Sequence, residues 1–347
     1  MAYTTINKST DYFNTKLYSG TGSSQNITGV GFQPDFTWIK SRSTSHEHKL
    51  IDVVRGVTKA VASDNTTQEF TDVQGLTAFG SNGYTIGTDS YYNTNGHNYA
   101  SWNWKAGTGQ GSSNTAGSIN TTYTSVNTTA GFSISSYTGN ASAGATIGHG
   151  LGAVPKFVIF KRLNSAGSWQ VYHHSIGNDH VLKLNSTDNK ANDDTFLYDT
   201  TPSSTLITLG GGGLVNGSGN NFICYAFAEK TGYSKFGSYV GNGNANGTFI
   251  YTGFKPAFII IKRLSDGYDW VMYTNKINGM NVMNDYLAPN STAAEVVNNA
   301  NQILDITSNG FKHRGTGAST NGNGQNYIYM AFGQSLVGSN NVPCTAR

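Results

Sequence analysis

Charge is scarce in this chain: Asp, Glu, Lys and Arg make up only 12% of its 347 residues, and the formal net charge is +3. The basic residues are scattered rather than clustered, which argues against a nucleic-acid partner. No apolar run approaches the roughly 20 residues that a membrane-spanning helix needs, so we expect no membrane insertion. The opening "MAYTTINKST" lacks the basic and apolar parts of a secretory signal, and we expect none.

Cysteine, proline and helical periodicity are also scarce. The two cysteines, Cys224 and Cys344, are too few for a disulfide framework, and Cys224 in "NFICYAF" is expected to be a small buried apolar residue. The best helical periodicity covers only residues 293–304. By contrast, 43 glycines separate short aromatic and β-branched runs. This pattern predicts a β-rich protein with many turns, and the 12% of aromatic residues argues against disorder.

One short phrase occurs three times, as "PDFTWIK" (34–40), "PKFVIFK" (155–161) and "PAFIIIK" (256–262). Each copy is preceded by a Gly-rich segment and ends in a second aromatic run: "NYASWNW", "NFICYAF" or "NYIYMAF". A similar pattern repeated at intervals of about 100 residues is typical of tandem modules. The sequence therefore predicts three copies of one module.

The phrase has the pattern of a central strand, because apolar residues occupy both of its faces after an initial proline. We expect Phe36, Phe157 and Phe258 to be equivalent buried core positions. The lysines that end the phrases, Lys40, Lys161 and Lys262, are expected to reach solvent from the strand end. The phrase is therefore interpreted as scaffold. Trp169 and Trp270 are expected at matching places after it, where copy one has His46, Glu47 and His48 instead.

The predicted fold is all-β, with three tandem antiparallel β-sandwich modules of jelly-roll or lectin-like type. The expected organisation is an N-terminal docking arm (1–15), module 1 (16–106), a Gly/Ser/Thr/Asn-rich linker (107–131), module 2 (132–231), module 3 (232–337) and a C-terminal tail (338–347). The linker composition is compatible with a flexible spacer or with an edge strand. The second and third modules, joined by a short connection, are expected to pack as a pair.

The opening "YTTINKSTDYFNTKLYSGTGSSQNITGVGFQPDFTWIKSR" and the later "SKFGSYVGNGNANGTFIYTGFKPAFIIIKR" carry a resemblance to a known group. They are similar to tandem, tail-fibre-like virion structural proteins of marine tailed phages of the cyanophage and pelagiphage type, from about Tyr3 to Ser335. The resemblance implies a β-sandwich protein on the virion surface, in the tail or the capsid, without catalytic residues or cofactors. It implies other virion proteins as partners, and we expect a homo-oligomer that contacts the host surface or a glycan.

Two alternatives to a tail fibre remain open at this point: a capsid decoration or head-fibre protein, and a glycan-cleaving depolymerase. Cleavage of a glycan needs two carboxylates that converge in a cleft. The densest acidic stretch holds Asp188, Asp193, Asp194 and Asp199, and copy three offers Asp285, Glu295 and Asp305. We expect these residues to lie in solvated loops, and we expect no enzyme.

Three loops precede the closing runs: "NTNGHNY", "LGGGGLVNGSGNN" and "GTGASTNGNGQNY". They are expected at equivalent places, either as adaptable recognition loops or as solubilising turns. Residues in and beside the first loop are the predicted carbohydrate-stacking groups: Tyr91, Tyr92, His97 and Tyr99. His46 and His48 alternate along the chain and could share a metal, but polar loop residues are the preferred interpretation, and no metal is expected.

The N-terminal arm carries Tyr3, Ile6, Tyr12 and Phe13 among polar residues. A free arm gains nothing from four large apolar groups, so we expect it to dock on its own first module or on another virion chain. An ordinary disordered terminus is the alternative. If docking serves assembly only, the modules should still fold without residues 2–15.

Overall fold

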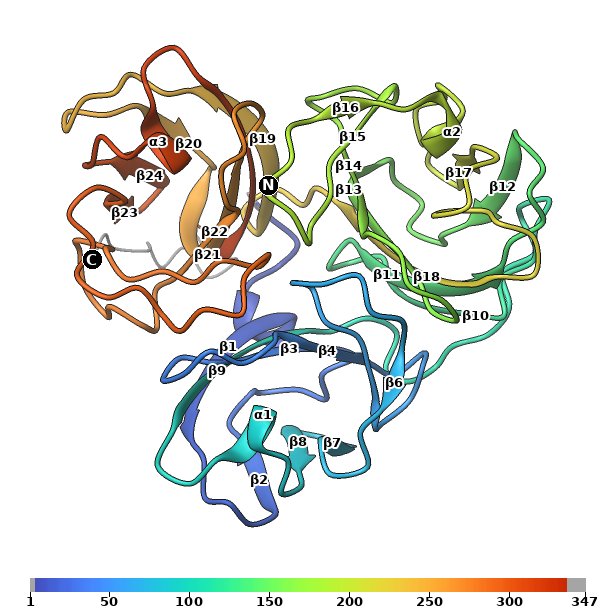
Figure 1. Ribbon diagram of the computed structural model, residues 1–347, viewed down its shortest axis with the longest axis horizontal. Coiled ribbons are helices and arrows are strands. Elements are labelled where there is room, and N and C mark those ends of the chain that lie inside the picture. The colour runs from blue at the N-terminus through green and yellow to red at the C-terminus, as the bar shows by residue number, and fades with distance from the viewer. Residues whose placement is uncertain (1–3, 336–347) are drawn as a thin grey trace.

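The computed structural model describes residues 4–335 and places three modules around one axis, at the corners of a triangle (Figure 1). Each module contains a larger and a smaller antiparallel sheet. The predicted all-β class is confirmed. The jelly-roll or lectin-like topology stays a prediction. No helix within residues 4–335 has the length and apolar character needed to cross a bilayer.

Module 1 follows a short 3-10 helix, η1 (Ser9–Asp11). Its larger sheet has the order β1 (Phe13–Ser19), β9 (Asn98–Trp104), β3 (Phe36–Ser41) and β4 (Lys49–Asp52). Its smaller sheet has the order β2 (Gln25–Thr28), β8 (Gly83–Ile86) and β7 (Leu76–Gly80). A hairpin of β5 (Lys59–Ala60) and β6 (Phe70–Thr71) and the one-turn helix α1 (Ser90–Asn93) complete it.

Module 2 repeats this plan with one additional strand in the larger sheet. The order there is β10 (Tyr123–Asn127), β11 (Phe132–Thr138), β18 (Asn221–Ala228), β13 (Pro155–Arg162) and β14 (Gln170–His173). Its other elements are β12 (Ala145–Gly148), β17 (Leu206–Leu209), β15 (His180–Val181), β16 (Ala191–Asn192) and α2 (Asp194–Leu197).

Module 3 has a larger sheet of β19 (Ser234–Val240), β25 (Asn326–Ser335), β21 (Phe254–Arg263) and β22 (Val271–Thr274), in that order. Its smaller sheet has the order β20 (Phe249–Tyr251), β24 (Gly310–His313) and β23 (Leu304–Thr307). The one-turn helix α3 (Ala318–Asn321) precedes β25. The repeated phrases thus form β3, β13 and β21, each an interior strand of its larger sheet.

The larger sheets are buried on both faces, as the two-sided apolar phrase predicts. One face packs on the smaller sheet of the same module. The other face meets the other two modules in one central core. Phe36, Phe157 and Phe258 are 2%, 2% and 0% exposed and all belong to that core, which confirms their predicted equivalence.

Modules 2 and 3 do pack against each other, as predicted, but not as a separate pair, because module 1 joins both in the central core. The Phe36 ring lies 4.6 Å from Tyr225 of module 2, and the Trp104 ring lies 5.5 Å from Phe258 of module 3. Phe227 and Phe332 connect modules 2 and 3 at 5.9 Å. Each large sheet therefore needs the other two modules to cover its inner face, because apolar surface is costly to leave in water.

The lysines that end the phrases do not reach solvent; each is 0% exposed. Each ammonium donates to a threonine carbonyl of a neighbouring module: Lys40 to Thr292 (3.0 Å), Lys161 to Thr66 (3.0 Å) and Lys262 to Thr187 (2.9 Å). Burial lowers the pKa of each lysine to about 8. The expectation of solvated strand ends fails because a loop of the neighbouring module covers each of them.

The linker is ordered and joins module 2. At its start it is held by module 1: Asp35 accepts hydrogen bonds from the backbone N–H groups of Ala106, the last residue of module 1, at 2.7 Å and of Thr108 and Gly109 at 3.0 Å each. Farther on, β10 pairs with β11, so the edge-strand alternative is the correct one. The helix indicated over residues 293–304 does not form: that segment forms a bridge between Val296 and Tyr286 and leads into β23.

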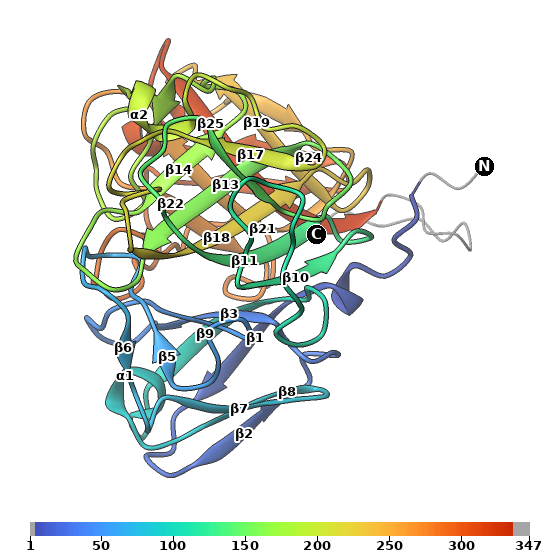
Figure 2. The same ribbon diagram turned by 90° about the vertical axis from the view of Figure 1, so that its right-hand side faces the viewer.

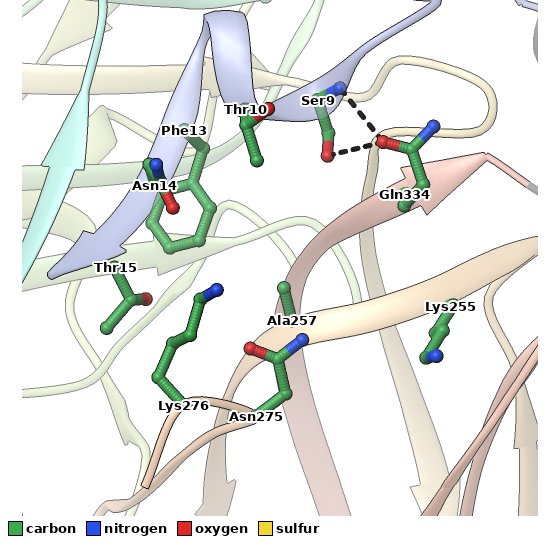
Figure 3. Close-up of a pocket in the computed structure, with 10 residues that line it drawn as sticks. All are labelled: Ser9, Thr10, Phe13, Asn14, Thr15, Lys255, Ala257, Asn275, Lys276 and Gln334. Atoms are coloured by element: carbon green, nitrogen blue, oxygen red, sulfur yellow. Dashed lines mark hydrogen bonds between the residues drawn. The ribbon is translucent and has the colours of Figure 1, made fainter. Parts of the chain in front are cut away.

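The N-terminal arm docks within its own chain, mainly against module 3. Ser9 donates to the Gln334 side chain of β25 through its N–H (3.1 Å) and its hydroxyl (2.9 Å), as Figure 3 shows. Ile6 and Phe13 are each 2% exposed and belong to the central core. Tyr3 lies outside the described residues. Docking is therefore confirmed, but the surface is the third module and the core rather than the first module alone.

Beside this contact lies a cleft of about 260 Å³ between the start of β1 and the strands β21 and β22 (Figure 3). At its border, the hydroxyl of Thr274 donates to that of Thr15 at 3.2 Å. The start and the end of the described chain lie at the same end of the molecule (Figure 2). The arm thus helps to hold modules 1 and 3 together, which the chain does not connect directly.

Candidate functional site

A closed ring of equivalent hydrogen bonds links the modules through the positions predicted to match. Trp169 Nε1 donates to the carbonyl of Ala62 in module 1 at 2.7 Å, and Trp270 Nε1 to Lys183 in module 2 at 3.0 Å. In module 1 the same place is taken by His48, whose Nε2 lies 3.0 Å from the carbonyl of Ala288 in module 3. The matching of the two tryptophans is confirmed, and His48 completes the ring.

This role excludes His48 from a shared metal site with His46. Trp38 Nε1 donates to His48 Nδ1 at 2.8 Å, so the proton of the neutral ring is on Nε2 and is donated to Ala288. Burial holds the pKa of His48 well below its ordinary value. His46 instead packs on Tyr91, with ring centroids 4.7 Å apart. Within residues 4–335, no three His, Cys, Asp or Glu side chains gather in a way that could hold a metal ion.

The four residues predicted to stack on carbohydrate do not form an open platform. Tyr92 and Tyr99 are each 0% exposed. The Tyr99 hydroxyl accepts from Thr94 N (2.9 Å) and donates to the carbonyl of Ser90 (2.8 Å), so it fixes the loop from inside. A stacking role for Tyr92 and Tyr99 does not fit their burial. Tyr91 and His97 are partly exposed, but Tyr91 already packs against His46.

Tyr91 nevertheless lines a groove of about 460 Å³ in module 1, together with residues of β4, β6 and the segment that follows β6. We call it the Lys49 groove; its charged and aromatic lining residues are Glu47, Lys49, Phe70, Asp72, Asp89 and Tyr91. The ammonium of Lys49 lies 4.3 Å from the centroid of the Phe70 ring and 4.1 Å from that of Tyr91. Two aromatic rings thus hold this cation in place.

The Lys49 groove carries more negative than positive groups. Glu47 pairs with Lys49 at 2.6 Å, while Asp72 and Asp89 lie along the same groove. Asp89 caps α1, because its carboxylate accepts from Tyr91 N at 2.8 Å. Partial burial, and then the nearby charge of Asp89, raise the pKa of Asp72. The groove offers hydrogen-bond acceptors to a ligand that carries many donors, such as a sugar.

Glu47 has a carboxylate equivalent in module 3, Asp269, but the cation of the groove has no charged equivalent. Strand pairing aligns Lys49 with Gln170 and Val271. The sequence analysis missed Lys49, Phe70, Asp72 and Asp89 as site residues. A signal was present: aligning the three copies shows charged residues in "HEHKLID" of copy one where copy three has "YDWVMYT".

The acidic stretch of module 2 does not form a comparable site. Asp188 is exposed and pairs with Lys183 at 2.8 Å. Asp193 caps α2 by accepting from Thr195 N at 2.9 Å. In module 3, Glu295 is paired with Arg42 of module 1, with their closest atoms 2.8 Å apart. These carboxylates serve turns, a helix cap and a contact between modules. Cys224 is buried, as expected.

The three loops before the closing runs do occupy equivalent places, and each is held by one buried asparagine: Asn93, Asn216 and Asn321, all 0% exposed. The side chain of Asn93 accepts from Thr21 N (2.8 Å) and donates to the carbonyl of Gly87 (2.7 Å). Its two counterparts make the same kind of contacts. These residues stabilise the loops rather than bind a ligand, because their polar groups are already satisfied.

Neither a curated protein nor a solved structure is similar enough to this chain to match it. One family matches nearly the whole length, from the 3-10 helix η1 to the end of β25, and so includes all three modules and the Lys49 groove. The match covers residues 8–335, and the chain belongs to the family described as "Domain of unknown function (DUF7483)".

Proposed function

We propose that this chain is a non-enzymatic structural protein on the surface of a phage virion, as a tail fibre or fibre-like knob. The observation that carries the proposal is the closed ring of three equivalent modules, which makes one chain the counterpart of a cyclic trimer. Such a body fits a threefold axis of a larger assembly. The resemblance of the phrases around residues 3–42 and 234–263 to phage virion proteins supplies the setting.

A capsid decoration or head-fibre protein is the alternative within the same class, because a capsid also offers threefold positions. Cryo-electron microscopy of purified virions tests both. We expect triangular density of this size at the particle surface, on the tail for the fibre and on the head for the alternative. Absence of the protein from purified, washed virions, as measured by mass spectrometry, would refute both.

The Lys49 groove is the proposed point of contact with a host-surface glycan. Its carboxylates supply acceptors for sugar hydroxyls, and Phe70 and Tyr91 supply apolar edges beside them. Replacing Asp72 with Asn should weaken binding of host polysaccharide at least tenfold in isothermal titration calorimetry. Asp188→Asn, an exposed carboxylate in module 2, is the matched control and should bind normally.

The glycan-cleaving alternative keeps one specific observation in its favour: Glu47, Asp72 and Asp89 all line one groove. A raised pKa is what a general acid needs, and the pKa of Asp72 is raised by burial and by the charge of Asp89. The same polysaccharide should be incubated with the protein and assayed for new reducing ends. Cleavage that is lost in both Asp72→Asn and Asp89→Asn would replace the binding proposal with an enzymatic one.

A further inference from the structure

The outer edge of the smaller sheet differs among the three modules. The edge strands β2, β12 and β20 are equivalent, since each has one buried isoleucine facing the module core: Ile27, Ile147 and Ile250. The residue before it is Asn26 in module 1, Thr146 in module 2 and Phe249 in module 3. Module 3 is therefore the one that places an aromatic residue at this point of the edge.

In module 2 this edge is occupied by another segment of the chain. Ile119 N donates to the carbonyl of Thr146 at 2.9 Å, and Thr146 N donates to Ser118 Oγ at 2.8 Å. The bridge between Ile119 and Ile147 is parallel, and Ile119 is only 8% exposed, within the apolar cluster of module 2. The linker thus adds a short guest strand to β12, with one serine and one isoleucine as its main contacts.

In module 3 the equivalent edge is exposed and apolar. Phe249 is 45% exposed and Tyr251 is 56% exposed. Val240, which is 53% exposed, lies beside them, because its carbonyl accepts a hydrogen bond from Thr248 Oγ1 at 2.8 Å. The equivalents of Phe249 and Tyr251 are small or polar, namely Asn26 and Thr28 in module 1 and Thr146 and Gly148 in module 2. Large apolar side chains on an open strand edge are a marker of an interaction surface.

The backbone of this edge is oriented for pairing. Thr248 accepts from His313 N at 3.1 Å and Thr252 donates to Asn309 O at 3.0 Å, so the even-numbered residues pair inward with β24 and its turn. Because backbone groups alternate along a strand, the N–H and C=O of Phe249 point away from β24. They correspond to the N–H and C=O of Thr146, which in module 2 make hydrogen bonds to the guest strand.

We propose that the β20 edge of module 3 is a strand-addition site for an extended segment of another protein. The segment binds β20 as residues 118 and 119 bind β12: it runs parallel to the strand and presents a hydroxyl residue followed by a β-branched apolar residue. The hydroxyl accepts from Phe249 N–H, the next N–H donates to the carbonyl of Phe249, and the apolar residue packs beside Ile250. An uncharged partner is expected, because Phe249, Tyr251 and Val240 would bury its flanks.

The test uses the full chain and a fluorescein-labelled peptide of sequence "SNTAGSINTTY", which copies residues 113–123. We expect saturable binding by fluorescence anisotropy, and a photoreactive group in place of the isoleucine should cross-link to residues 248–252. Phe249→Lys should weaken binding at least tenfold, because a charge on the edge disfavours pairing. Asn26→Lys, the same change on the module 1 edge, is the matched control and should bind as the unchanged protein does.

A second variant separates pairing from side-chain packing. Phe249→Pro removes an N–H that points away from β24, so the native ladder is kept while the guest loses its donor, and binding should again fall at least tenfold. Unfolding curves of both variants should match that of the unchanged protein. Cross-links outside residues 248–252, or binding unaffected by both variants, would overturn the proposal. A dimer in light scattering that Phe249→Lys abolishes would also overturn it, since the occupant would then be a second copy.

Discussion

Phe258 belongs to module 3, but its ring contacts aromatic residues of module 1 as well as Phe332 of its own module. Its removal should therefore destabilise the whole molecule. Its ring lies 5.4 Å from Phe13, 6.0 Å from Trp102 and 5.5 Å from Trp104, all in module 1 or its arm. Phe258→Ala should lower the free energy of unfolding by about 3–5 kcal/mol, the usual cost of such a truncation in a well-packed core. Because the core is shared, the loss applies to all three modules together.

Urea unfolding measured by tryptophan fluorescence and by far-UV circular dichroism checks this prediction. Tryptophans are present in every module, so the fluorescence signal reports on all of them. We expect one transition by both probes, shifted to lower urea in Phe258→Ala. Tyr251→Ala, an exposed aromatic residue of the same module, should shift it by much less. Separate transitions, with the signal of module 1 unchanged by Phe258→Ala, would refute the shared core.

Three further predictions concern the ring and its closure. The pKa of Lys161 in the folded protein, about 8, lies below the ordinary value of 10.5, so between these values the unfolded chain binds more protons than the folded one. The free energy of unfolding should therefore rise from pH 8 to 9.5. Urea titrations should show a smaller rise in Lys161→Met. Trp270→Phe keeps an aromatic ring but leaves the carbonyl of Lys183 without its donor, which should cost about 1–3 kcal/mol in the same assay. Deleting residues 2–15 removes Ile6 and Phe13 from the central core, so the melting temperature should fall; an unchanged melting temperature would show that the arm is dispensable for folding.

The sequence is sufficient to predict the class, the repeat and the core positions, because these depend on local patterns. The strand phrases, the buried phenylalanines and the matched tryptophans all follow from alternation and spacing within one copy. The closed ring could not be predicted in this way, because it depends on contacts between residues far apart in the chain. Lys40 illustrates the limit: a lysine at a strand end usually reaches water, and only the neighbouring Thr292 loop prevents it here.

The burial of Tyr92 and Tyr99, two of the four predicted carbohydrate-stacking residues, escaped prediction for a related reason. Tyrosines in a Gly- and Asn-rich loop have the composition of a recognition surface, but composition does not tell which ring faces inward. Tyr92 lies within α1 and Tyr99 within β9, and the side chains of both belong to the core of module 1. The residues that line the groove come from three separate stretches, around positions 47–49, 67–74 and 89–91, and no local pattern brings these together.

Departures from threefold equivalence are the most informative features of this molecule. Positions that agree among the modules, such as the phrase phenylalanines, the terminal lysines and the loop asparagines, are all explained by packing and by contacts between modules. Two features lack equivalents in the other modules: the aromatic-bound cation of the Lys49 groove in module 1, and the large apolar residues on the β20 edge of module 3. Since the ring needs neither, stability alone gives no reason for them. The proposed glycan at the first surface and the proposed protein segment at the second explain these features independently, so variants at one surface should leave binding at the other unchanged.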